Sequence, residues 1–236
     1  MKLARAILAV VLRLAMRLLL RLEVDGLERI PARGPVILIF NHITFLDPVI
    51  LTGLLPRESA AMSKVENFSK PVVGLLLRIF GAFPVERGRV DRRALRRSLE
   101  VLERGGVLLI APEGTRSRVP GLQEGRDGIA YVALQSGVPV IPVGIGGAER
   151  FSANLRNLRR TPVRVRVGRP FRLVPKGPKV RRPELHEMTT EAMYELARVL
   201  PPAYRGVYAD LSQARQEHLE FLDVVSGEGS HGHAQG

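Results

Sequence analysis

The chain has 236 residues, of which 36 are Lys or Arg and 23 are Asp or Glu, so its formal net charge is +13. It contains no Cys and no Trp, and 45% of its residues are hydrophobic. This composition excludes a wholly disordered chain, a disulfide framework, a thiolate-ligated metal site and a cysteine nucleophile. The positive charge indicates an anionic partner, which is nucleic acid, an anionic membrane surface or a phosphorylated substrate.

The first predicted element is a helix over residues 1–22. Arginines interrupt its apolar run, which therefore lacks the stretch of about 18 uninterrupted apolar residues typical of a spanning helix. A signal peptide is disfavoured because there is no charge-free core and no cleavage site, and a core-packing helix would not need five cations. The cations share one side of a helical projection and leave the other side apolar: Lys2, Arg5, Arg13, Arg17 and Arg21. This pattern predicts a membrane-interface helix, with its arginines toward lipid phosphates.

Residues 23–200 alternate short apolar runs with helical patterns. The predicted strands cover residues 36–40, 59–64, 82–85, 107–111, 139–145 and 163–167. The predicted helices cover residues 47–55, 71–80, 91–104, 127–136 and 184–200. This alternation predicts a single α/β domain with a central mixed, largely parallel sheet flanked by helices. Residues 201–236 are predicted as a C-terminal helix, over 210–225, followed by a disordered Gly/Ser/His-rich tail.

The charge is distributed unevenly along the chain. Residues 150–182 include 12 basic residues and no acidic residue, whereas residues 184–236 include nine acidic residues and three arginines. The basic stretch fits binding to anionic lipid, to CoA or to an acidic carrier protein, and it also fits a solvated face that offsets the acidic segment. The pattern leaves these alternatives open.

His42 is the histidine that the pattern places within the α/β body. The others fall on predicted acidic C-terminal helices or in the tail: His186, His218, His231 and His233. His42 follows the predicted strand 36–40 directly, where α/β domains place functional loops. Asp47, five residues later, can accept a hydrogen bond from Nδ1 and leave Nε2 as a base. The spacing alone equally fits a structural His beside a helix-capping Asp.

A second group of polar residues follows the predicted strand 107–111. Its sequence, Pro-Glu-Gly-Thr-Arg-Ser over residues 112–117, fits a phosphate-binding turn, because Arg116 offers a bidentate fork and the hydroxyls add donors. An ordinary strand-to-helix turn is an equally good interpretation. The chain has no P-loop, no complete dinucleotide-binding fingerprint and no Gly-x-Ser-x-Gly nucleophile elbow.

Four segments together resemble a known family. They are Asn-His-Ile-Thr-Phe-Leu-Asp at 41–47, Gly-Ala-Phe-Pro-Val-Glu-Arg at 81–87, Pro-Glu-Gly-Thr-Arg-Ser at 112–117 and Val-Pro-Val-Ile-Pro-Val at 138–143. In this order they resemble the motif blocks of the glycerolipid acyltransferase family, most closely its bacterial 1-acyl-sn-glycerol-3-phosphate acyltransferases. The sequence departs from the family pattern at Ala111, where an aromatic residue is common, and at Arg126, where Lys is frequent.

The resemblance implies transfer of an acyl group from a thioester, acyl-CoA or acyl carrier protein, to the free hydroxyl of lysophosphatidic acid, giving phosphatidic acid. It implies that His42 is the general base and that Asp47 orients it. The substrate-binding residues that it implies are Arg87, Glu113, Gly114, Thr115, Arg116 and Ser117. We expect no bound cofactor and no metal, because one His with one Asp is too few ligands.

A lipid substrate and the N-terminal helix together predict a peripheral or monotopic protein on the cytoplasmic face of the cell membrane, with an anionic lipid surface as partner. One alternative is the same chemistry on another acceptor, glycerol-3-phosphate or a different lysolipid. The other is a non-enzymatic basic protein that binds membranes or nucleic acid. Nucleic acid is disfavoured because the chain has only 8 Phe and 4 Tyr for base stacking and no recognisable RNA-binding motif.

Overall fold

A nine-stranded sheet is the centre of the computed structural model, which describes residues 2–86, 91–117 and 121–223, with only the backbone of residues 2–5. Its main path follows the order β1-β7-β6-β2-β5-β3-β4, and β8 pairs with β6 and β9. The strands are β1 (Leu20–Asp25), β2 (Val36–Phe40), β3 (Ser59–Lys64), β4 (Phe83–Val85), β5 (Val107–Ile110), β6 (Val140–Gly146), β7 (Thr161–Val167), β8 (Phe171–Leu173) and β9 (Leu219–Phe221). The pairings β6–β7, β6–β8 and β8–β9 are antiparallel, and the others are parallel. The predicted α/β domain with a mixed, largely parallel sheet is therefore confirmed.

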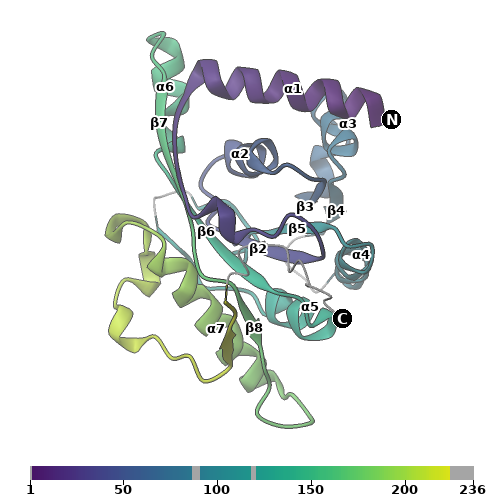
Figure 1. The fold of residues 1–236 in the computed structure, drawn as a ribbon, viewed down its shortest axis with the longest axis vertical. Coiled ribbons are helices and arrows are strands. Elements are labelled where there is room, and N and C mark those ends of the chain that lie inside the picture. The colour runs from purple at the N-terminus through teal and green to yellow at the C-terminus, as the bar shows by residue number, and fades with distance from the viewer. Residues whose placement is uncertain (1, 87–90, 118–120, 224–236) are drawn as a thin grey trace, which may run out of the picture.

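Helices cover both faces of this sheet (Figure 1). Two of them, α1 (Lys2–Leu19) and α2 (Leu46–Leu54), contribute to the core on one face. Three others, α4 (Arg92–Glu103), α5 (Gly128–Ser136) and α7 (Arg182–Arg198), contribute to the core on the opposite face. The short helices α3 (Pro71–Ile79) and α6 (Phe151–Arg156) lie at the same end of the molecule as α1 in Figure 1.

The central strand β2 is buried along its whole length. Its side chains alternate between the two cores, with Leu38 and Phe40 in the α1/α2 core and Ile37 and Ile39 in the α4/α5/α7 core. A strand that is covered on both faces needs apolar residues at every position, in agreement with the buried strand predicted from the run Val-Ile-Leu-Ile-Phe. This strand carries the residues that follow it, Asn41 and His42, to the edge of the sheet.

The predicted N-terminal helix is three residues too long. The helix ends at Leu19, and Leu20–Asp25 forms β1, which pairs in parallel with β7. The register places Glu23 opposite Arg164, and the two side chains form an ion pair at 2.8 Å. Hydrogen bonding to β7, which a pattern of hydrophobicity does not reveal, therefore outweighs the helical periodicity in this segment.

The predicted C-terminal helix over 210–225 is wrong for the residues that the structure describes. The segment forms a short 3₁₀ turn at Leu211–Gln213 and then β9, whose partner is β8. His218, which precedes β9, is buried against α7 rather than exposed on a helix. The predicted disordered tail falls on residues 224–236, outside the described residues. The sequence pattern also does not predict α6, β8 or β9.

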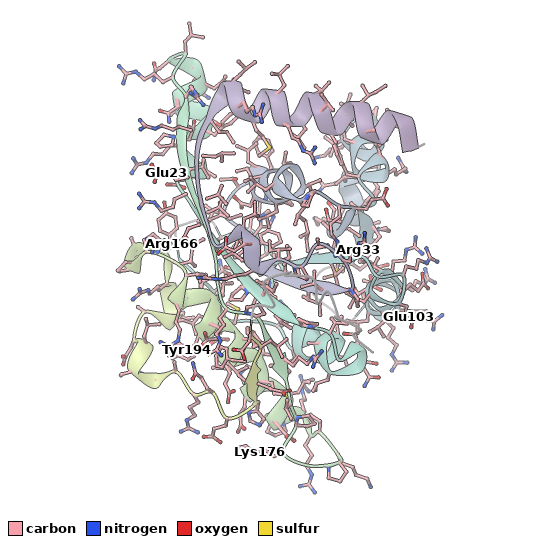
Figure 2. All side chains as sticks on the ribbon, in the orientation of Figure 1. Glu23, Arg33, Glu103, Arg166, Lys176 and Tyr194 are labelled. Carbon is pink, nitrogen blue, oxygen red and sulfur yellow. The ribbon has the colours of Figure 1, made fainter. Side chains whose placement is uncertain are left out.

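The two sides of α1 have different environments, and side chains project from both of them (Figure 2). Toward the protein, Leu12 and Met16 pack against α2, and the Arg13 guanidinium donates to the carbonyl oxygens of Gly53 and Leu55, each at 3.1 Å. Arg13 thus satisfies carbonyls at the end of α2, so the expectation that it faces lipid is wrong. The outer side exposes an apolar stripe: Ile7, Val10, Val11, Leu14 and Leu18. In the described part of the chain, no helix is long and apolar enough to cross a membrane.

Candidate active site

The site forms where the carboxyl ends of three neighbouring strands meet. Strand β2 pairs in parallel with both β5 and β6, so the segments after β2 and β5 leave the sheet at the same edge. Two hydrogen bonds join these segments: the Ser117 N–H donates to the His42 carbonyl oxygen at 2.8 Å, and the His42 N–H donates to Glu113 Oε1 at 3.2 Å. The structure therefore brings together the two groups of residues that the sequence singles out separately.

His42 and Asp47 form a hydrogen-bonded pair, with Nδ1 and Oδ2 separated by 3.0 Å. The Asp47 carboxylate also accepts hydrogen bonds from the N–H groups of Ile43 and Thr44 at 2.7 Å and from the Thr44 hydroxyl at 2.9 Å. These donors fix the carboxylate at the start of α2, and because it is an acceptor, Nδ1 carries the histidine proton. Nε2 then has its lone pair available, and no described residue hydrogen bonds to it. The His42 side chain is 12% exposed and that of Asp47 is 2% exposed.

Asn41 fixes the loop from the other side. Its amide Nδ2 donates to the Ile145 carbonyl oxygen and its Oδ1 accepts from the Ile145 N–H, both at 2.8 Å. The side chain thus continues the pairing of β2 with β6 beyond the last strand residue. Its partner is a distant strand, so this contact depends on the order of the strands in the sheet.

Glu113 is buried and connects three segments of the site. Its carboxylate accepts hydrogen bonds from the Ser117 hydroxyl at 2.7 Å, from the Gln123 N–H at 3.0 Å and from the His42 N–H. Burial raises the pKa of the Glu113 carboxyl, although the hydrogen bonds from Ser117, Gln123 and His42 lower it in part. Glu113 and Ser117 are thereby engaged in holding the loop. Gln123 and Thr44 were not predicted, because their roles depend on tertiary contacts that short motifs do not specify.

The other predicted binding residues have different degrees of exposure. Gly114 has φ of +69°, a left-handed conformation that favours glycine, and an added Cβ would lie 3.1 Å from Cδ of Arg126. Thr115 is half-buried and Arg116 is exposed on the same loop. Arg87 lies outside the described residues. It follows shortly after β4, whose carboxyl end points to the same edge because β3 is parallel to both β4 and β5.

His218 corrects the expectation that His42 alone lies in the α/β body. It is 1% exposed, its Nδ1 lies 2.9 Å from Glu191 Oε1, and its N–H donates to Glu191 Oε2 at 2.9 Å. This second histidine–carboxylate pair joins α7 to the segment before β9 and is separate from the loops around His42. Among the described residues, no group of three or more His, Asp and Glu side chains could hold a metal ion.

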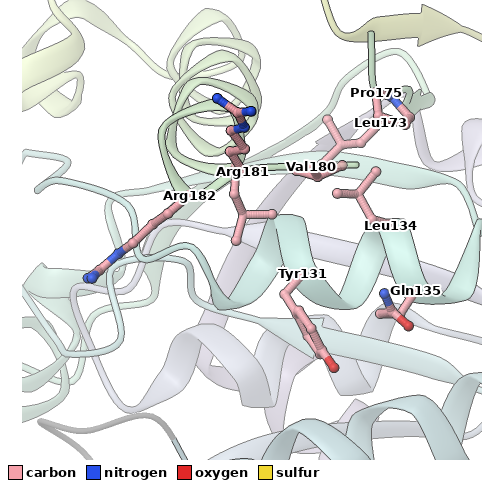
Figure 3. Close-up of a pocket in the computed structure, with 9 residues that line it drawn as sticks. Tyr131, Leu134, Gln135, Leu173, Pro175, Val180, Arg181 and Arg182 are labelled. Atoms are coloured by element: carbon pink, nitrogen blue, oxygen red, sulfur yellow. The ribbon is translucent and has the colours of Figure 1, made fainter. Parts of the chain in front are cut away.

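A surface hollow of about 500 Å³ lies elsewhere, between α5, β8 and the start of α7 (Figure 3). Apolar side chains of Tyr131, Leu134 and Leu173 line it together with Arg181 and Arg182. Neither His42 nor Glu113 contributes to its walls. The candidate site is therefore defined by the polar groups at the strand ends and not by this hollow.

The model of a protein family described as "Acyltransferase" matches residues 21–146, which is more than half of the chain and contains every strand and loop of the site. The chain belongs to this acyltransferase family. The resemblance drawn from the four sequence blocks is thus confirmed, and the acyltransferase match includes His42, Asp47 and the 112–117 loop.

Several curated proteins are similar to this acyltransferase. The chloroplastic 1-acyl-sn-glycerol-3-phosphate acyltransferase LPAT1 of Arabidopsis thaliana is 32% identical over 132 residues, covering 54% of this chain and 36% of that protein. A 1-acyl-sn-glycerol-3-phosphate acyltransferase of Borreliella burgdorferi is 28% identical over 134 residues, covering 56% and 54%. A lyso-ornithine lipid O-acyltransferase of Pseudomonas aeruginosa is 35% identical over 114 residues, covering 48% and 43%. The matched region thus spans about a third to a half of these relatives.

A solved structure supports the same fold over most of the chain. The crystal structure of the 1-acyl-sn-glycerophosphate acyltransferase PlsC from Thermotoga maritima superposes with a TM-score of 0.61 and 25% sequence identity, covering 84% of this chain and 80% of that one. The shared fold therefore extends well beyond the matched family region.

The buried Glu113 carboxyl should make stability depend on pH. Its pKa is raised above the usual 4.5 because burial makes ionisation of the carboxyl more costly, so the free energy of unfolding should fall as the pH rises from that value through the raised pKa. We expect the stability of the wild type relative to Glu113→Gln to fall over this range in urea unfolding at a series of pH values. Glu103→Gln, at an exposed position, is the control. A difference that stays constant or grows with pH would contradict the assignment.

Proposed function

We propose that this acyltransferase moves a fatty acyl group from a thioester donor to the free hydroxyl of 1-acyl-sn-glycerol-3-phosphate, giving phosphatidic acid. The observation that carries the proposal is the His42–Asp47 pair, because it fixes the proton on Nδ1 and leaves Nε2 as a base at the edge of the sheet. The names of the Arabidopsis, Borreliella and Thermotoga relatives support this choice of acceptor.

In this mechanism, Nε2 of His42 removes the proton from the acceptor hydroxyl while the oxygen attacks the thioester carbonyl carbon. The tetrahedral intermediate collapses, the carbon–sulfur bond breaks, and the imidazolium returns its proton to the leaving thiolate. Asp47 keeps the ring oriented and stabilises the imidazolium between these steps. A base in this position contributes about 10²–10⁴ to the rate. The acyl group passes directly to the acceptor, so the chain needs no nucleophile of its own, in agreement with its lack of Cys.

The acceptor phosphate would bind to the loop after β5. The exposed Arg116 supplies a charge-assisted, bidentate donor there, and Glu113 holds the loop at a fixed distance from His42. Gly114 allows the close turn. Thr115 and Ser117 are the other predicted substrate-binding residues of this loop, and the Ser117 hydroxyl donates to Glu113. Arg87, which lies outside the described residues, would add a second cation. Anchoring the phosphate orients the hydroxyl toward Nε2, and such positioning is a large part of catalysis in bimolecular transfers.

A second candidate is the same transfer to a different lysolipid. The Pseudomonas relative named a lyso-ornithine lipid O-acyltransferase favours it, because that protein is 35% identical in the matched region. The donor is acyl-CoA or an acyl carrier protein. Turnover of the purified protein with lysophosphatidic acid, glycerol-3-phosphate and lyso-ornithine lipid, each with both donors, distinguishes these possibilities.

We also propose that the enzyme lies on the cytoplasmic surface of the membrane through α1, as a peripheral or monotopic protein. The outward stripe of α1, which includes Leu14 and Leu18, is exposed, and α3 at the same end of the molecule exposes Val72 and Leu75. Exposed apolar surface of this extent is costly in water and is typical of an interaction site. A bilayer contact there would bring a membrane-resident acceptor to the enzyme.

Replacing His42 tests the base. His42→Ala should lower kcat by about 10²–10⁴ because no other group removes the hydroxyl proton, while thermal stability and vesicle binding stay unchanged. Asp47→Asn should lower kcat as well, since it disturbs the orientation of the ring. His186→Ala, at an exposed histidine of α7, is the matched control and should keep full activity. Near-normal turnover by His42→Ala would refute the base assignment.

Replacing Arg116 tests the phosphate contact. Arg116→Ala should raise the KM for lysophosphatidic acid about tenfold or more, because a hydrogen bond to a charged group contributes about 1.5–3 kcal/mol. The KM for the thioester should change little. Arg92→Ala, at an exposed position of α4, is the control. Equal changes in both KM values would contradict a role in acceptor binding.

Two charged substitutions on the outer face of α1 test the membrane contact. Leu14→Asp with Leu18→Asp should weaken binding to anionic vesicles by about a hundredfold or more, since burying one leucine contributes about 1.5–3 kcal/mol. Point changes are preferable to deleting residues 1–22, because Leu20–Asp25 is a strand of the sheet. Val207→Asp, at an exposed aliphatic residue outside this face, is the control. Unchanged cosedimentation would exclude α1 as the main contact.

A further inference from the structure

The turn after α6 carries an unusual leucine. Leu158 is 94% exposed and has φ of +51°, and it is the one non-glycine residue with positive φ in the part of the chain that the structure describes. Exposure of a leucine is unfavourable in water, and the left-handed conformation is unfavourable for a side chain of this type. Asn or Gly at this position would make the same turn without either cost. The turn alone therefore does not account for a leucine at this position.

The surroundings of Leu158 form a small projection, which we call the α6 tip, residues 155–160. It combines a second exposed leucine, Leu155, with two exposed arginines, Arg156 and Arg159. Neither arginine has an acidic partner among the described residues. Leucines between unpaired arginines suit the boundary of an anionic bilayer, where the apolar side chains enter the acyl region and the guanidinium groups bind lipid phosphates.

The α6 tip is attached to the end of α1. Nη2 of Arg160 donates to the carbonyl oxygens of Arg17 and Leu20, each at 2.7 Å. These bonds satisfy the C-terminal carbonyls of α1 and place the tip at the same end of the molecule as the apolar stripe (Figure 1). The tip and the stripe are therefore neighbouring parts of one surface, although they are about 140 residues apart in the chain.

The helix that carries the tip also contacts the catalytic loop. The ring of Phe151, at the start of α6, meets the ring of Phe45 edge-on, with centroids 6.5 Å apart. Phe45 lies between His42 and Asp47 in the sequence and is 57% exposed. The α6 tip is thus connected, through Phe151 at the start of α6, to the loop that carries His42.

From these contacts we infer that the α6 tip is a second bilayer contact, which inserts Leu155 and Leu158 between anionic lipid headgroups. The inference rests on the proposed membrane face of α1 and adds a function to it. Contact through α1 and α3 alone would leave the α6 end of the molecule free to tilt away from the lipid surface. A further contact at α6 removes this freedom, so that the edge of the sheet with His42 keeps one orientation toward the lipid surface.

The absence of Trp from the chain allows a direct test of the tip. Single-tryptophan variants Leu158→Trp, Leu14→Trp and Val207→Trp are mixed with vesicles of phosphatidylglycerol and phosphatidylcholine. The inference requires a blue shift of emission, and quenching by brominated lipid, for the tip and α1 probes but not for Val207→Trp. A shift at Leu14→Trp without one at Leu158→Trp overturns the inference and leaves the α1 face intact. No shift at either probe overturns both.

Leu158→Asn separates a lipid contact from a structural role. Asn tolerates the left-handed conformation, so the variant should unfold at a higher temperature while its vesicle binding weakens about tenfold or more. A leucine needed for folding would instead give a lower unfolding temperature, and that result overturns the inference. So does loss of self-association in sedimentation with unchanged vesicle binding, because the tip would then contact a second copy of the chain.

The arginines of the tip are tested by charge reversal. Arg156→Glu with Arg159→Glu should weaken binding to vesicles that contain phosphatidylglycerol much more than Arg92→Glu with Arg96→Glu, which makes the same change in net charge on α4. The difference should disappear on vesicles of phosphatidylcholine alone. Equal losses for the two pairs would show that only the total charge matters and would contradict a specific contact at the tip.

Discussion

The parallel pairing of β2 with β5 and β6 is the constraint on which the candidate site depends. It directs three chain segments to one edge of the sheet, where side chains join them. Asn41 connects the end of β2 to β6, and Glu113 connects the segment after β5 to the backbone of His42. The apolar strands thus do more than form a core, because their register sets the distances between polar groups that are about 70 and 100 residues apart in sequence.

The part of the site that is local in sequence could be predicted, and the part that depends on strand order could not. His42 and Asp47 are five residues apart, so a loop leading into a helix is sufficient to pair them. The contact between Glu113 and His42 requires β5 to be next to β2, which no local pattern states. The family resemblance supplied what spacing lacked, because it identified both segments as parts of one site. The contributions of Thr44 and Gln123 appear only when the chain is folded.

Part of the positive charge of the chain is engaged in ion pairs within the protein. Several cations of the 150–182 stretch have partners within the described residues, such as Arg164 with Glu23, Arg169 with Asp223 and Lys176 with Glu217. The last two join the basic stretch to the acidic C-terminal segment, in agreement with the interpretation that these regions offset each other. Exposed ion pairs of this kind contribute little stability. Their main effect is to reduce the number of cations that are available to an external anion.

The direct passage from α1 to β1 has a mechanical consequence. The helix ends at Leu19 and the strand begins at Leu20, so no flexible connector separates them, and Arg160 clamps the junction from β7's side. A movement of α1 is therefore transmitted to β1, because no hinge between the two elements can bend to accommodate it. His42 follows β2, which is joined to β1 through β6 and β7, so its position relative to α1 is set by the sheet. An acceptor hydroxyl bound at the proposed site would therefore have to approach His42, since the sheet holds His42 at a fixed place relative to α1.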